Sequence, residues 1–188
     1  IVSGTSYVNF GFYIGATKDN LKELQEAQGA IGIKVYLGSS TGGLLMDDYA
    51  IFEKILKETT LLVACHAEDE ACLKQEGASV NRPAPMLSSS ESHNLLRPEK
   101  CAWIAVEKVA AIALRIKKPV YFCHISGKEE LVAIENARGK GAKIYAEATP
   151  HHLFLSTEET KEAGGYAQVN PPIRSSKSTA YLQKALIS

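Results

Sequence analysis

Four ionisable side chains stand toward the carboxyl ends of short apolar runs that are typical of buried strands. They are Lys34, His66, His124 and Glu147. Taking an unpaired ammonium into an apolar interior costs free energy or forces the amine to lose its proton, so Lys34 must either reach solvent or serve a purpose. Two neutral imidazoles are good ligands for zinc or a similar divalent ion. The repetition on successive runs favours a metal site over four unrelated structural residues.

A lysine beside such a site has two chemical uses. As a free amine, Lys34 can react with carbon dioxide to give a carbamate whose two oxygens bridge two metal ions. Divalent ions polarise a carbonyl and lower the pKa of bound water to about 7, so this use predicts metal-assisted hydrolysis of an amide-like bond. The alternative is a Schiff base with a carbonyl substrate, which leaves His66 and His124 without a role. Taken singly, each residue also has a structural interpretation, such as a pairing of Glu147 with Lys143 or His151.

Length and composition bound the class of protein. The 188 residues, 45% of them hydrophobic, suffice for one domain with its own core. Lysine plus arginine equals aspartate plus glutamate at 21 each, which gives no electrostatic reason to expect nucleic acid or an anionic membrane as a partner. Because no uncharged apolar run reaches about 18 residues, no transmembrane helix is expected.

The cysteines and the first residues indicate the cellular setting. Cys65, Cys72, Cys101 and Cys123 form no C-x-x-C pair and lie mostly in apolar runs. This predicts reduced thiols in a cytoplasmic protein rather than a disulfide framework. Residues 1–4 contain neither an initiator methionine nor the basic-then-apolar order of a signal peptide, so we expect an internal piece of a longer protein.

The elements that must position these side chains alternate along the chain. Strands are expected at 7–13, 32–39, 61–66, 120–124 and 143–149, with helices after Thr17, from about Asp47, from Pro98 to about Lys117, around Leu131, from the capping-box pattern at 156–159 and near Tyr181. The stretch 77–98 reads as irregular. Such alternation predicts an α/β fold with a parallel sheet, in which active sites lie at the carboxyl ends of the strands. Side-chain alternation places Lys34 on one face with Gly32 and Tyr36.

Five motifs, in order, carry a resemblance to a known family. They are Gly-Ile-Lys-Val-Tyr-Leu-Gly-Ser-Ser-Thr-Gly at 32–42, Cys-His-Ala-Glu-Asp at 65–69, Cys-His-Ile-Ser at 123–126, Ala-Glu-Ala-Thr-Pro-His-His-Leu at 146–153 and Asn-Pro-Pro-Ile-Arg at 170–174. Together they resemble the dihydroorotase branch of the amidohydrolase superfamily. The resemblance implies a (β/α)8 barrel, of which this chain would supply about strands 3 to 7, and a two-metal centre that holds zinc in most members.

The resemblance also implies residue roles. Lys34 would be the carboxylated lysine that bridges the metals, and His66 and His124 would be ligands of one metal. Asn170 falls where dihydroorotases place a residue that contacts the pyrimidine ring, and Arg174 belongs to the same loop. The resemblance leaves open whether Cys123 and Glu147 hold an extra metal or orient the ligands.

Departures from the family pattern limit the expectation. The first-strand His-x-His pair and the eighth-strand Asp-His-Ala-Pro motif are absent, and a full barrel needs about 250 residues. Residues 1–188 are therefore expected to form one incomplete barrel domain that is inactive in isolation. For the intact protein the resemblance implies reversible hydrolysis of the ring amide of dihydroorotate. Hydantoinase, dihydropyrimidinase or allantoinase activity is the alternative, a non-enzymatic scaffold is a third, and association into a homo-oligomer is open.

Overall fold

A parallel sheet of five strands forms the centre of the structure, a computed structural model that describes residues 4–39, 43–79 and 89–187. The strands are β1 (Phe12–Gly15), β2 (Ala30–Tyr36), β3 (Val63–His66), β4 (Val120–Phe122) and β5 (Ile144–Ala146). Their order in the sheet is their order in the chain, and every neighbouring pair is parallel. Helices lie in the connections, as in consecutive units of a (β/α)8 barrel, so the predicted fold class is confirmed.

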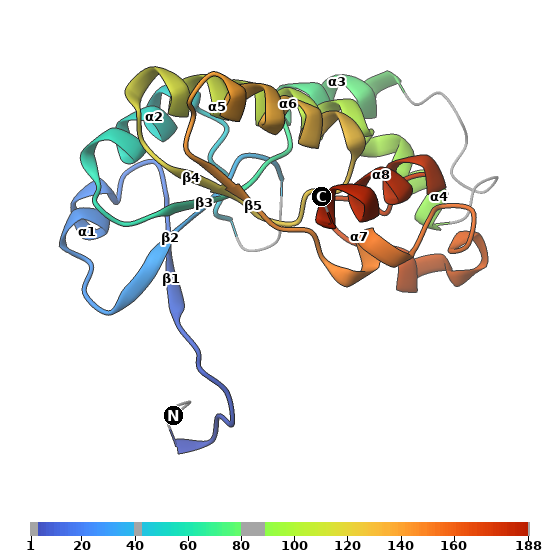
Figure 1. Ribbon diagram of the computed structural model, residues 1–188, viewed down its shortest axis with the longest axis horizontal. Coiled ribbons are helices and arrows are strands. Elements are labelled where there is room, and N and C mark those ends of the chain that lie inside the picture. The colour runs from blue at the N-terminus through green and yellow to red at the C-terminus, as the bar shows by residue number, and fades with distance from the viewer. Residues whose placement is uncertain (1–3, 40–42, 80–88, 188) are drawn as a thin grey trace.

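The helices cover one face of the sheet and its carboxyl end. They are α1 (Leu21–Glu26), α2 (Tyr49–Glu58), α3 (Glu70–Ser79), α4 (Ser89–Leu96), α5 (Glu99–Ile116), α6 (Lys128–Gly139), α7 (Pro150–Phe154), the 3-10 helix η3 (Lys161–Ala167) and α8 (Ser176–Leu186). Figure 1 shows α2, α5 and α6 side by side along that face. The same three helices contribute buried apolar residues to one continuous core cluster.

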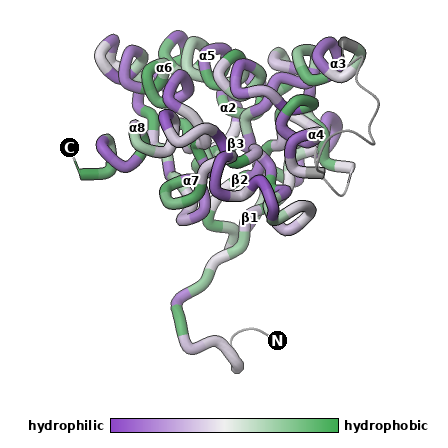
Figure 2. The backbone as a smooth tube through the Cα atoms, turned by 90° about the vertical axis from the view of Figure 1, so that its right-hand side faces the viewer, coloured by the Kyte–Doolittle hydropathy of each residue, from purple (hydrophilic) through white to green (hydrophobic). Residues whose placement is uncertain are grey.

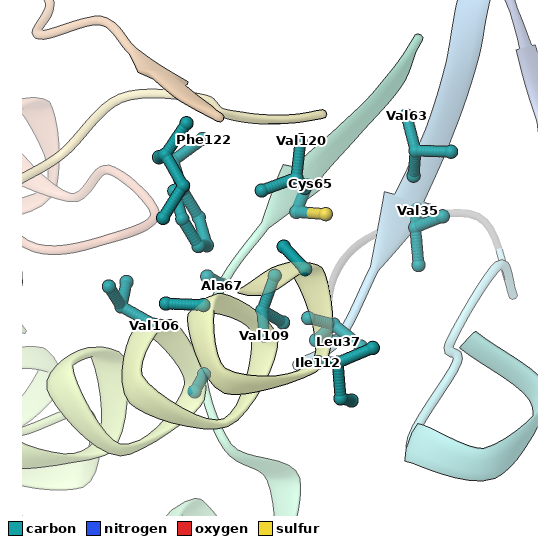
Figure 3. Packing of buried hydrophobic residues seen from close by; sticks show 14 of the residues in the cluster. Val35, Leu37, Val63, Cys65, Ala67, Val106, Val109, Ile112, Val120 and Phe122 are labelled. Carbon is teal, nitrogen blue, oxygen red and sulfur yellow. The ribbon is translucent and has the colours of Figure 1, made fainter. Parts of the chain in front are cut away.

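Strand periodicity explains why the core lies on that face. Figure 3 shows strand residues such as Val35, Cys65 and Phe122 packed toward Val109 and Ile112 of α5, and all of these are buried. The opposite face carries Lys34, Tyr36, Tyr121 and Tyr145, which are only partly buried or exposed. Parallel sheets are normally covered on both faces, and in a closed barrel this second face is the interior.

The first predicted strand is placed wrongly by several residues. The pairing of β1 with β2 begins at Phe12 opposite Ala30, and residues 4–11 extend away from the sheet (Figures 1 and 2). Tyr7 and Val8 are therefore exposed although they are apolar. An apolar alternation predicts a strand only where a neighbouring strand is available, and β2 is too short to pair with this segment.

The stretch 77–98, predicted to be irregular, is partly helical. Helix α3 continues to Ser79 and α4 occupies Ser89–Leu96, while the residues between them lie outside the described ranges.

The prediction that a short helix starts at the capping box at 156–159 is wrong, because no helix begins at these residues. Ser156 and Glu159 do exchange the expected hydrogen bonds, but they close a turn that precedes η3.

The prediction of four reduced thiols is wrong for two of them. A disulfide joins Cys72 of α3 to Cys101 of α5, whereas Cys65 and Cys123 are free. The spacing of 29 residues gave no sign of this pair, because only the packing of α3 on α5 brings the two side chains together. Within the described ranges, none of the helices is long and apolar enough to cross a membrane.

Candidate active site

The carboxyl ends of β2, β3 and β4 bring four side chains together at one edge of the sheet. The Lys34 ammonium donates to Cys123 Sγ over 2.9 Å. His66 Nδ1 lies 3.3 Å from His124 Nε2, and the two ring centroids are 5.0 Å apart in an edge-on arrangement. The predicted meeting of Lys34, His66 and His124 at a shared edge is therefore what the fold produces.

The strand register accounts for this meeting. Lys34 of β2 is paired with Ala64 of β3, and Tyr36 is paired with His66. The hydrogen bonding between β3 and β4 continues one residue beyond the end of β4, because the Cys123 amide donates to the Cys65 carbonyl over 2.9 Å. Lys34 therefore lies two residues before the level of His66, and its long side chain reaches Cys123 just past the end of β4.

The backbone of His124 departs from the strand. Its φ is 40°, one of two positive values among the described non-glycine residues. This left-handed conformation, which costs an L-residue roughly 1–2 kcal/mol, ends the side-chain alternation of β4. The turned backbone presents the His124 ring to His66.

His124 is held neutral by its surroundings. Burial lowers its pKa to about 3, and the nearby charges of His66 and Lys34 act in the same direction. A neutral imidazole keeps one nitrogen lone pair free, which is the form that binds metal ions. The Nδ1 atom of this ring is buried and has no hydrogen-bond partner among the residues that the structure describes.

The spacing of the two rings fits a shared metal ion. Zinc binds histidine nitrogens at about 2.0–2.1 Å in tetrahedral geometry, which separates two nitrogen ligands by about 3.3–3.4 Å. The distance from His66 Nδ1 to His124 Nε2 is 3.3 Å. A third ligand of the usual kind is not at hand, since no group of three or more His, Cys, Asp and Glu side chains within the described ranges could hold a metal ion.

Cys123 and Glu147 lie beside this cluster with partners of their own. Burial raises the pKa of the Cys123 thiol, and the Lys34 charge opposes that shift. Glu147 follows β5 and accepts a hydrogen bond of 2.7 Å from the Tyr121 hydroxyl. Tyr121 therefore takes the place of the partners considered for Glu147 from the sequence, Lys143 and His151.

Asn170 and Arg174 lie on the loop between η3 and α8 and differ in exposure. Asn170 is exposed and precedes a cis peptide bond to Pro171, whose carbonyl oxygen lies 3.0 Å from His152 Nε2. Arg174 is buried, and it donates to the Ser126 hydroxyl over 3.1 Å and to the Arg97 carbonyl over 2.6 Å. Asn170 thus remains available to a ligand, whereas Arg174 ties two loops of the edge together.

Sequence reasoning missed two residues beside the histidine pair, one that faces His66 and one that binds this first residue. Glu68 Oε2 lies 2.9 Å from His66 Nε2, and Arg97 donates to the same carboxylate. A carboxylate two residues after a strand-end histidine was the available signal for Glu68. Arg97 gave none, because it lies in the stretch that had no helical or strand periodicity.

Comparison with known proteins identifies the class. No family model matches the sequence. The solved dihydropyrimidinase of Brevibacillus agri superposes with a TM-score of 0.81 and 27% identity, covering 97% of this chain and 41% of that chain. An allantoinase from Streptomyces avermitilis is 26% identical over 99% of this chain and 42% of its own length. The chain is therefore homologous to part of the cyclic amide hydrolases.

The chain is also similar in sequence to dihydroorotases. A dihydroorotase from Methanosarcina mazei is 30% identical over 96% of this chain and 41% of its own length. The resemblance predicted from the five motifs is thus confirmed. The chain spans about two fifths of the length of each of these relatives.

Proposed function

We propose that the whole protein is a metal-dependent dihydroorotase, which interconverts dihydroorotate and carbamoyl aspartate by reversible hydrolysis of the ring amide. The observation that carries this proposal is the cluster of Lys34, His66 and His124 at the carboxyl edge of the sheet, with the histidine nitrogens at metal-ligand spacing. The 30% identity to a dihydroorotase supports the choice of substrate. Residues 1–188 would be one incomplete barrel domain of that protein.

The residues of this chain would have distinct roles. His66 Nδ1 and His124 Nε2 would hold one zinc ion, and Lys34, after reaction with carbon dioxide, would bridge to a second as a carbamate. Bound divalent ions supply polarisation of the amide carbonyl and acidification of water. Burial keeps His124 unprotonated, and the Cys123 thiol holds the Lys34 amine at the edge where it can be modified. Asn170, exposed on its loop, would contact the substrate ring.

Substrate assays on the whole protein test the proposal. Dihydroorotate, dihydrouracil, hydantoin and allantoin are supplied side by side, with zinc and bicarbonate present. Dihydroorotate should be the preferred substrate, and Lys34→Ala should abolish turnover. The matched control is Lys143→Ala, which removes an exposed lysine just before β5 and should leave the rate unchanged. Turnover that survives Lys34→Ala would contradict the role of this lysine.

A hydantoinase or dihydropyrimidinase is the second candidate, favoured by the superposition on the Brevibacillus agri enzyme. Preference for dihydrouracil or hydantoin in the same assay would decide for it. A scaffold without activity is the third. Metal analysis separates the scaffold from both enzymes, because a scaffold should contain no zinc.

We also propose that the protein is located in the cytoplasm and acts on a small molecule. We expect no nucleic-acid or membrane partner, and association into a homo-oligomer stays open. The disulfide between Cys72 and Cys101 bears on this location, since disulfides are uncommon in reducing compartments. Thiol titration of the protein from freshly lysed cells tests it. Free thiols at both Cys72 and Cys101, located by alkylation and peptide mapping, agree with the cytoplasm, whereas a Cys72–Cys101 disulfide agrees with an oxidising compartment.

A further inference from the structure

A disulfide fastens the first turn of α3 to the first turn of α5. Cys72 and Cys101 are each the third residue of their helix, and they stand 29 residues apart in the chain. Asp69, between β3 and α3, donates its amide to the Cys101 carbonyl over 2.8 Å, and its Oδ1 atom accepts from the Cys72 amide over 2.9 Å. The segment that leaves β3 is therefore tied to both cysteine residues.

Little apolar packing holds α3 apart from this disulfide. Among the side chains that the structure describes, the buried apolar residues of α3 are Cys72 and Leu73. With Cys101 they form a small cluster that is separate from the main core, in which α2 and α6 are anchored. The ion pair of Glu76 with Lys100 at 2.7 Å is partly exposed, and such pairs contribute little to stability. Loss of the disulfide should therefore release α3 more readily than the helices of the main core.

Helix α3 in turn holds the chain that leaves β2. The Glu70 carboxylate, buried in the first turn of α3, accepts from the Ser39 amide over 2.8 Å and also from the Ser39 hydroxyl. Ser39 follows β2, the strand that carries Lys34. Release of α3 would thus loosen the carboxyl edge of the sheet beside the proposed active site.

The position of the two sulfurs favours reduction. The first turn of a helix stabilises a thiolate, and a disulfide whose reduced form is stabilised is more easily reduced. Acidic groups near these turns oppose this effect only in part, because lysines lie 2.6 Å from Asp69 and 3.5 Å from Glu70, and burial raises the pKa of Glu99 toward its neutral form. A reducible pair also agrees with a cytoplasmic protein, in which disulfides are usually transient.

We propose that Cys72 and Cys101 form a redox switch, which clamps α3 to α5 as a disulfide and releases α3 as two thiols while the sheet and the main core persist. Two molecules of a thiol such as glutathione supply the change. Their sulfurs join in a new disulfide, and their two protons pass to Cys72 and Cys101. The attack should fall on Cys72, which is 8% exposed, because Cys101 is 0% exposed. Neither the substrate nor the metal of the proposed function takes part.

Glutathione mixtures test whether the pair converts. The whole protein is equilibrated with mixtures that run from oxidised to reduced glutathione, its thiols are trapped by alkylation, and peptide mapping scores Cys72 and Cys101. The pair should pass from the disulfide to two thiols within the series. A disulfide that persists in a large excess of reduced glutathione would overturn the switch, and so would a pair that never forms the disulfide.

Hydrogen exchange shows what reduction releases. The amides of α3 should exchange faster in the reduced than in the oxidised protein, by on the order of 30-fold or more, as the typical contribution of a disulfide implies. The amides of α2, which packs in the main core, should exchange equally in both forms. Equal exchange of α3 in the two forms would contradict the proposal, and so would a matching rise in α2.

The matched control combines Cys72→Ala with Cys101→Ala. This variant keeps the free thiols of Cys65 and Cys123 but cannot form the disulfide. Its α3 should exchange as in the reduced wild type, and glutathione should have no further effect. A response to glutathione that remains in the variant would assign the change to Cys65 or Cys123 and overturn the proposal. Because the wild type is compared in both redox forms, the proposal can also fail without any variant.

Discussion

Gly38 allows the close approach of the chain after β2 to the residue that faces His66. A Cβ at this position would lie 2.7 Å from the Glu68 carbonyl oxygen and 2.8 Å from the Glu68 Cβ. Both distances are shorter than real Cβ contacts allow, and one contact is to backbone, which cannot turn away. Gly38→Ala must therefore displace the segment that carries Glu68.

The magnitude follows from two opposing effects. Overpacking of a buried site costs about 1–3 kcal/mol. Gly38 does not have a positive φ, so alanine suits its backbone and stabilises by about 0.4–1 kcal/mol through the unfolded chain. The net expectation is a loss of about 1–2 kcal/mol in the free energy of unfolding.

Urea unfolding of the wild type and the variant measures the loss. Gly139→Ala is the control, since a Cβ on this last residue of α6 meets nothing within 4 Å. It should be neutral or more stable by up to about 1 kcal/mol. A Gly38→Ala protein as stable as the control would refute the reasoning.

Three further variants test the fold. Phe122→Ala removes a fully buried ring from the sheet and should cost about 3–5 kcal/mol, measured as a lower urea midpoint. Asp48→Ala removes the side chain that accepts from the Ala50 and Ile51 amides at the start of α2 and should cost about 1 kcal/mol in the same assay. Burial raises the pKa of Glu130 to about 7 from 4.5, so its stabilising contribution should be lost as pH rises through this interval, and Glu130→Gln should remove that slope. Parallel pH profiles of the two proteins would contradict the shift.

The strand-end side chains could be predicted from sequence because parallel strands that follow one another share an edge. Apolar runs around Lys34, His66 and His124 were therefore enough to place the three together. The same alternation placed Ile33 and Val35 on the face opposite Lys34, where both are fully buried.

Long-range contacts could not be predicted in the same way. Arg97 reaches Glu68 across 29 residues, and its stretch of sequence has no apolar period that would reveal a helix. The disulfide between Cys72 and Cys101 depends likewise on how two helices pack. The strand predicted over 7–13 is wrong before Phe12, because the pairing of β1 with β2 begins only at that residue.

The left-handed backbone of His124 implies that stability and activity favour different residues at this position. Glycine adopts this conformation without the penalty that an L-side chain meets, so His124→Gly would relieve strain while deleting a proposed ligand. Selection for stability alone would thus favour the inactive residue at this position. A library screened only for thermal resistance should accumulate glycine or asparagine at 124, and each such clone should lack the proposed ligand.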